Sequence, residues 1–104
     1  MNVAAIIRSQ IGNWTMARVG ARDLLSSDTS LRFRISVEGK RGHFKVEITL
    51  NPSDTYTVKV YQLRKHGLDV RTLRSLESVY AGSLPELVVS FSRPEGLNFR
   101  NPWN

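Results

Sequence analysis

The feature that most constrains this chain is the alternation of apolar and polar residues through the middle of the sequence. The pattern runs through residues 31–37, 44–50 and 56–63. A period of two places successive side chains on opposite faces of a β-strand, so each segment is expected to be a strand with one buried and one solvated face. The short connections carry glycine, proline and asparagine, which favour turns. The sequence therefore predicts a three-stranded antiparallel meander.

Residues 68–80 fit two patterns. The apolar residues at 73, 76, 79 and 80 have helical spacing, whereas alternation across the segment is typical of a strand. We interpret the segment as a strand, because a meander that continues by short hairpins is the simplest topology. The sheet would then have four strands.

Helical signals lie near the two ends of the chain. Residues 2–11 have apolar positions at helical spacing, with Asn2 as the expected N-cap and Gly12 at the end. Ser83 and Glu86 form a capping box ahead of an apolar stripe, which predicts a second helix that ends before Arg93. Between the first helix and the meander we expect a short strand within residues 14–20 and a flexible loop at residues 24–30.

These elements predict an α+β fold, in which an antiparallel three- or four-stranded β-meander has an N-terminal and a C-terminal amphipathic helix packed on one face. The chain of 104 residues is the size of one domain. We place this domain at residues 1–96 and a C-terminal tail, which either docks onto a partner or folds back onto the sheet, at residues 97–104. The predicted core face consists of Phe33, Ile35, Val37, Phe44, Val46, Ile48, Tyr56, Val58 and Val60.

Catalytic and metal-binding patterns find little support. The sequence has no cysteine, which excludes a disulfide framework, a thiolate zinc site and a cysteine nucleophile. His43 and His66 fall near turns of different hairpins and lack metal-ligand spacing. We therefore expect no catalytic residue, no metal and no cofactor, and predict that the protein is not an enzyme. The apolar stretch at residues 3–7 is far shorter than the roughly 20 residues that span a bilayer, so we expect no membrane partner and a cytoplasmic location.

The charge balance points to anionic partners. Lysine and arginine number 15 against 9 aspartates and glutamates, for a formal net charge of +6. The field of such a molecule attracts polyanions. Most of the cations are arginines, whose forked donors suit phosphate groups. Nucleic acid is therefore the first partner to consider.

The solvated face of the predicted meander would carry four cations, Glu47 as the single anion and Tyr61 as an aromatic on which a base could stack. A sheet face kept soluble by charged side chains is the alternative explanation. A second basic group lies at a glycine-flanked hairpin tip, from which it could enter a nucleic-acid groove or contact an acidic partner. The predicted residues for binding nucleic acid or a partner protein are Arg32, Arg34, Lys40, Arg41, Lys45, Lys59 and Tyr61.

Over residues 6–90 the chain is similar to a family of small proteins from bacteriophages, prophages and integrative elements. The resemblance is carried by residues 10–13, 19–22, 31–33, 48–56 and 79–84, with Asp54-Thr55-Tyr56 and Val79-Tyr80-Ala81 the most specific. The chain departs from the family at Asn13-Trp14, where a second glycine is missing. The family has no assigned activity, so the resemblance transfers no catalytic residue. It implies an accessory protein of a mobile element, acting in the cytoplasm of a bacterial host.

Two functions of different class follow. The first is a nucleic-acid-binding accessory factor that uses the basic sheet face and loses affinity as salt rises. The second is a protein-binding inhibitor of a host defence complex, which looks like an anti-CRISPR and places cations against an acidic surface. A homo-oligomer formed by strand pairing at a sheet edge is a further expected partner state.

Overall fold

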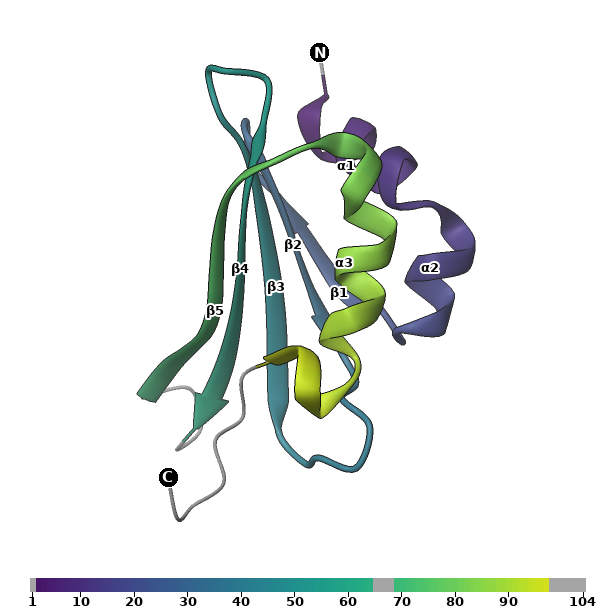
Figure 1. Cartoon of the computed structure of the whole chain (residues 1–104), viewed down its shortest axis with the longest axis vertical. Coiled ribbons are helices and arrows are strands. Elements are labelled where there is room, and N and C mark those ends of the chain that lie inside the picture. The colour runs from purple at the N-terminus through teal and green to yellow at the C-terminus, as the bar shows by residue number, and fades with distance from the viewer. Residues whose placement is uncertain (1, 65–68, 98–104) are drawn as a thin grey trace.

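A five-stranded antiparallel sheet with helices on one face forms the architecture of this chain, as a computed structural model that describes residues 2–64 and 69–97 shows (Figure 1). The strands lie in sequence order, β1-β2-β3-β4-β5. The α+β class and the antiparallel meander are confirmed, but the sheet has five strands, and a third α-helix joins the two that were expected. The elements are α1 (Val3–Ile11), α2 (Asn13–Arg18), β1 (Arg22–Ser26), β2 (Ser30–Ile35), β3 (His43–Leu50), β4 (Tyr56–Arg64), β5 (Asp69–Val79), η2 (Ala81–Ser83), α3 (Leu84–Phe91) and η3 (Pro94–Leu97).

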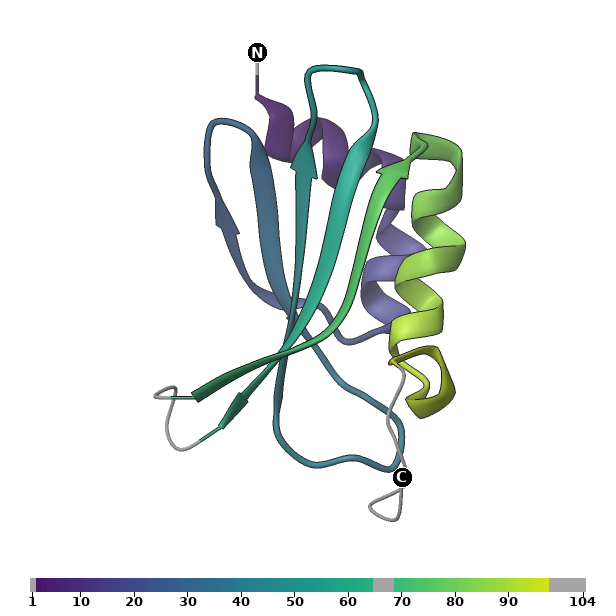
Figure 2. The same ribbon diagram turned by 60° about the vertical axis from the view of Figure 1, so that its left-hand side comes forward.

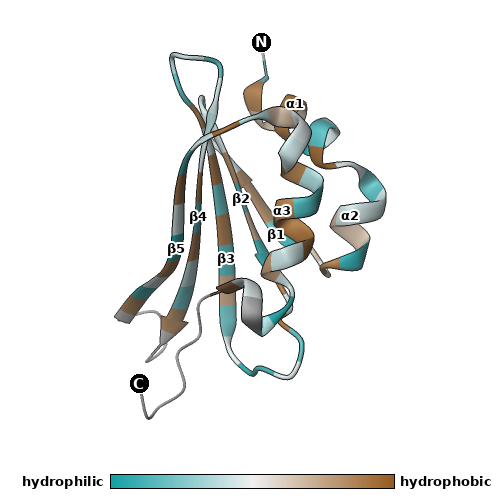
Figure 3. Ribbon diagram, viewed as in Figure 1, coloured by the Kyte–Doolittle hydropathy of each residue, from teal (hydrophilic) through white to brown (hydrophobic). Residues whose placement is uncertain are grey.

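The core lies between the sheet and the helices, which share one side of it (Figure 2). Every residue of the predicted core face is buried, and Phe33, Val46 and Val60 have no exposed surface. The alternation of polar and apolar residues along the strands is visible in Figure 3. Because the helices cover one face only, the other face of the sheet carries the solvated side chains. We call it the outer face.

The segment between α1 and the meander differs from its prediction. Residues 13–18 form α2 rather than a strand, because Gly12, at φ 91°, ends one helix and begins the next. Its amide donates to Arg8 O and its carbonyl accepts from Met16 N. Residues 22–26 form β1, where the sequence predicted a loop from residue 24 onward.

The two edge strands of the sheet, β1 and β5, contain extra residues that shift their register. β1 has one more residue than β2 between Arg22 and Leu25, and Asp23 there has φ 54°. β5 has two such irregularities against β4, one of them next to Ser78 with φ 56°. These β-bulges change the phase of the side-chain alternation. They explain why residues 68–80 fit two patterns, although the strand interpretation is confirmed.

Helix α3 buries Leu84, Val88 and Phe91 as its sequence predicts, but its N-terminus differs. The expected capping box is wrong: Ser83 has helical backbone angles and makes no side-chain cap bond, because residues 81–83 form the turn η2. The N-cap of α1 is confirmed, since Asn2 Oδ1 accepts a hydrogen bond from Ala5 N at 3.1 Å.

The segment after α3 turns back onto the sheet. Arg74 Nη1 of β5 donates to Gly96 O at 2.8 Å, and its guanidinium lies over the Phe91 ring. Leu97, the first residue of the expected tail, is fully buried in the core. Residues 98–104, the remainder of that tail, lie outside the described residues.

Candidate nucleic-acid interface

The register of the sheet places the predicted binding side chains of β2, β3 and β4 on the outer face, as the sequence indicates. Two rows of directly paired residues cross the strands. Paired residues in an antiparallel sheet point to the same side, with side chains about 5 Å apart. The first row is Arg22, Arg34, Lys45, Tyr61 and Thr72, and the second is Leu25, Arg32, Glu47, Lys59 and Ser75.

Three cations are consecutive in the first row: Arg22 pairs with Arg34, and Arg34 pairs with Lys45. We call these three residues the cationic row. Like charges in directly opposed positions destabilise a sheet. The cost is partly offset for Arg22, whose Nη1 donates to Gly20 O and Ser36 Oγ. Lys45 is the member of the cationic row for which no such contact offsets the cost among the described side chains.

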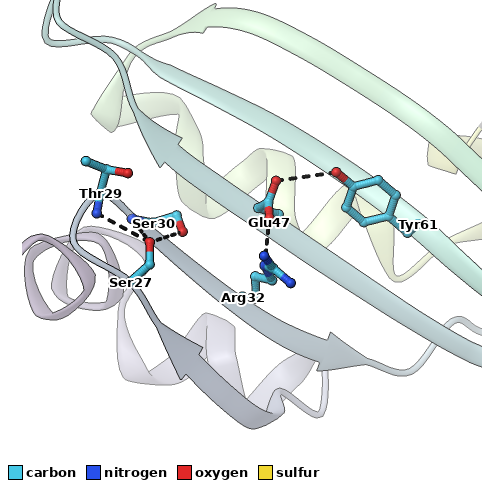
Figure 4. A network of polar contacts seen from close by, with 6 residues as sticks. All are labelled: Ser27, Thr29, Ser30, Arg32, Glu47 and Tyr61. Carbon is cyan, nitrogen blue, oxygen red and sulfur yellow. Dashed lines mark hydrogen bonds and ion pairs between the residues drawn. The ribbon is translucent and has the colours of Figure 1, made fainter. Parts of the chain in front are cut away.

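Carboxylates neutralise two of the predicted arginines. Arg32 Nε lies 2.7 Å from Glu47 Oε2, and Arg34 Nη1 lies 3.0 Å from Asp23 Oδ2. The sequence predicted four cations against Glu47 alone, and this count is wrong because the unforeseen strand β1 brings in Asp23. Tyr61 joins the same network through its hydroxyl, which donates to Glu47 Oε1 at 3.3 Å (Figure 4).

Lys45 and Lys59 are the cations left for a ligand at the centre of the face. Among the side chains that the structure describes, which exclude those of residues 64–69 and 95, no carboxylate lies within ion-pair distance of either amino group. Lys59 is paired with Glu47 in the register, but no ion pair joins their charges. Glu47 thus separates Lys59 from the positive charge of Arg32 in the second row.

Lys40 and Arg41 lie away from this face. They are exposed in the β2–β3 connection, which packs toward the end of α3: Glu38 N donates to Ser92 O at 2.7 Å. Figure 1 shows this connection at one end of the sheet. The structure therefore does not bring the two hairpin residues together with the rows of the outer face.

Tyr61 of the first row is half-buried, and its environment disfavours the phenolate. Burial raises the pKa of Tyr61 above its ordinary value, and the charge of Glu47 and the hydrogen bond to it raise that pKa further. The positive charge of Arg32 acts in the opposite direction. The ring therefore stays neutral and is held in place by its hydroxyl.

A hollow of about 440 Å³ opens on the outer face between β1 and β4. We call it the β1–β4 hollow. It combines charged groups with three leucines, and two of these, Leu24 and Leu25, are exposed hydrophobic residues. Its lining residues are Asp23, Leu24, Leu25, Arg34, His43, Lys45 and Leu63.

Sequence reasoning missed the part of this face that β1 provides. Arg22, Asp23 and Leu25 were not recognised because all five residues of β1 are exposed, so the segment has no buried alternate positions to reveal a strand. The pair of leucines at 24 and 25, out of phase with a two-residue period, was the available signal of a bulge.

No family model matches the chain, and no characterised protein or solved structure is significantly similar to it. Among the helices of the described ranges, none is both long and apolar enough to cross a bilayer. Over the same ranges, no three histidine, aspartate or glutamate side chains gather in a way that could hold a metal ion.

Proposed function

We propose that this protein is a non-enzymatic nucleic-acid-binding factor that holds its ligand on the outer face of the sheet. The observation that carries the proposal is the cationic row, in which Arg22, Arg34 and Lys45 occupy directly opposed positions on three neighbouring strands. Such an arrangement offers a phosphate backbone a line of donors, and Lys45 within it has no carboxylate partner among the described side chains. The net charge of +6 adds long-range attraction.

The neighbouring Tyr61 supports nucleic acid over other polyanions. It continues the cationic row on β4, directly opposite Lys45. A neutral aromatic ring beside a cation offers a stacking surface to a base as well as a contact to a phosphate. A sulfated sugar or a polyglutamate chain has no planar aromatic base to place on this ring.

The test is an electrophoretic mobility shift with single- and double-stranded DNA and RNA at two salt concentrations. About three phosphate contacts to a single strand predict an affinity that falls about 20-fold between about 50 and 200 mM salt. Replacing Lys45 and Lys59 together by glutamine should abolish most of the binding. The matched control replaces Lys40 and Arg41 by glutamine, which removes the same charge from the hairpin. No shift at about 50 mM salt, or equal losses in both double variants, would contradict the proposal.

A second candidate is a protein-binding module that uses the helical layer, and one pair of residues favours it. Trp14 of α2 is 70% exposed, and the Arg18 guanidinium lies 5.3 Å from the centre of its ring. Tryptophan and arginine dominate the binding energy of many protein interfaces. The first acidic residue of the chain is Asp23, so the exposed charges of α1 and α2 are positive and suit an acidic partner.

This candidate predicts one stoichiometric partner in a pull-down from nuclease-treated bacterial lysate. Trp14→Ala should abolish recovery of that partner, whereas the variant that lacks Lys45 and Lys59 should retain it. If no protein is recovered in stoichiometric amount, or if Trp14→Ala recovers it equally well, the second candidate is wrong. The proposed setting of both functions is that of a mobile-element accessory protein in a bacterial host, as the resemblance to proteins of bacteriophages, prophages and integrative elements implies.

A further inference from the structure

The β1–β4 hollow joins the cationic row to the apolar part of the outer face. Lys45 lines the hollow and is paired with Arg34 on one side and Tyr61 on the other. Neighbouring strands lie about 4.8 Å apart. An anion bound to Lys45 on β3 would therefore have the Arg34 guanidinium beside it on β2 and the Tyr61 ring beside it on β4.

Contacts at two nitrogens fix the Arg34 guanidinium at the wall of the hollow. Its Nη1 pairs with Asp23 and its Nη2 contacts His43 Nδ1, which engages two of its five N–H groups. Its Nε–H is buried without an acceptor among the described residues. A donor group held in this way loses little side-chain freedom when it binds an anion.

The net charge of the side chains that line the hollow suits a ligand with one negative charge. Arg34 and Lys45 contribute two positive charges and Asp23 one negative charge, which leaves one positive charge in excess. Asp23 repels any anion, but its carboxylate is occupied by Arg34. A phosphodiester carries one negative charge, so it fits this balance better than a doubly charged terminal phosphate.

Apolar side chains line part of the hollow and continue the surface past it. Leu63 is paired with Val70 and Tyr61 with Thr72, so uncharged side chains occupy this part of β4 and β5. Leu25 is 58% exposed and Val70 is 53% exposed. The backbone of a duplex presents phosphates and sugars and gains nothing from such groups, whereas unpaired bases can bury their faces on them.

We propose, resting on the function proposed above, that the β1–β4 hollow binds one phosphodiester of single-stranded nucleic acid and that the base next to it lies on the Tyr61 ring. Lys45 is the central contact of this site. The ligand is a flexible single strand, and duplexes are excluded as specific ligands because their bases are unavailable to Tyr61.

The experiment measures the fluorescence anisotropy of a labelled oligothymidylate of about ten nucleotides, and of a duplex of equal length, at about 50 mM salt. Lys45→Gln should weaken oligothymidylate binding about tenfold. The matched variant Lys59→Gln, which removes the same charge from the same face outside the hollow, should weaken it by less than about threefold. Tyr61→Leu should weaken it about tenfold, as expected for one lost stacking contact, and Tyr61→Phe by no more than about twofold. Far-UV circular dichroism and the thermal midpoint establish that each variant is folded.

The outcomes separate this inference from the function on which it rests. Equal losses for Lys45→Gln and Lys59→Gln, or equal affinity for the duplex, would overturn the hollow as a site and leave diffuse binding to the face. Unlabelled polyglutamate that competes as well as oligothymidylate would also overturn it, in favour of an acidic protein ligand. If the wild type binds neither probe, the proposed function and the inference both fail.

Discussion

Arg32 and Glu47 lie opposite each other on β2 and β3 and form an ion pair of 2.7 Å between Nε and Oε2. Glu47 also accepts the hydrogen bond of Tyr61. This carboxylate therefore reduces the positive charge of the outer face while it holds the aromatic ring. Its two effects can be separated experimentally.

Glu47→Gln should raise the affinity for oligothymidylate about two- to fivefold at low salt, because Arg32 is released for phosphate contacts. The gain should shrink as salt increases. Anisotropy titrations at several salt concentrations measure both. The control is Glu86→Gln on the exposed surface of α3, which makes the same change in net charge. An equal gain in the control would show that only the total charge matters.

Tyr61 predicts an alkaline loss of stability. Its pKa is raised in the folded protein by burial and by Glu47, so the folded state retains a proton that the unfolded state releases. The contribution is fully present below the unfolded pKa of about 10 and is lost as pH rises through the higher folded pKa. Absorbance of tyrosinate, compared between wild type and Tyr61→Phe, identifies this titration. In Glu47→Gln the pKa of Tyr61 should fall; an unchanged value would exclude the role of Glu47.

Gly96 predicts a steric requirement where the chain turns back after α3. A Cβ at this position would lie 2.0 Å from Ser90 O, so the backbone must move to accept any side chain. Gly96→Ala should lower the free energy of unfolding by about 2 kcal/mol or more. Gly82→Ala is the matched control, because a Cβ there meets nothing within 4 Å. Urea denaturation of both variants measures the difference, and similar midpoints would contradict the packing described.

Substitution by alanine should have different effects on stability at the N-termini of α1 and α3. Asn2→Ala should cost about 1 kcal/mol, because it removes the acceptor for Ala5 N. Ser83→Ala should change stability by less than about 0.5 kcal/mol, since Ser83 makes no cap bond despite its favourable sequence. Thermal unfolding of both variants is the measurement. A larger loss of stability for Ser83→Ala would show that Ser83 caps α3 after all and would contradict the structure at this N-terminus.

The regular strands were predictable because the central residues on one face of each are buried. In β2, β3 and β4, burial of alternate residues such as Phe33, Val46 and Val58 requires a strict two-residue pattern, and the sequence displays it. The amphipathic helices α1 and α3 were predictable for the same reason, with a different period. Ile6 is the exception in the stripe of α1, at 36% exposed.

The elements that sequence reasoning missed lack such a complete pattern. α2 is six residues long, less than two turns, and its buried Thr15 and Met16, followed by Val19 at the C-cap, are too few to distinguish a helix from a strand. In β1 the bulge at Asp23 breaks the alternation, so half of the candidate site was visible in the sequence and half was not. The register of β2 to β4 placed Arg34, Lys45 and Tyr61 together, whereas Asp23, which neutralises Arg34, and the exposed Leu25 come from the missed strand.

The bulges of β1 and β5 have a consequence for how this chain behaves at high concentration. An edge strand with an uninterrupted row of free amides and carbonyls is a template for fibril growth. The exposed side chains of Leu25 and Val70 on the two edge strands would strengthen such association. Asp23 and Ser78, which both have positive φ, lie at bulges of the two edge strands, and a bulge bends a strand and increases its local twist. The same irregularities that hid these strands from the sequence pattern thus oppose stacking of molecules edge to edge into insoluble aggregates.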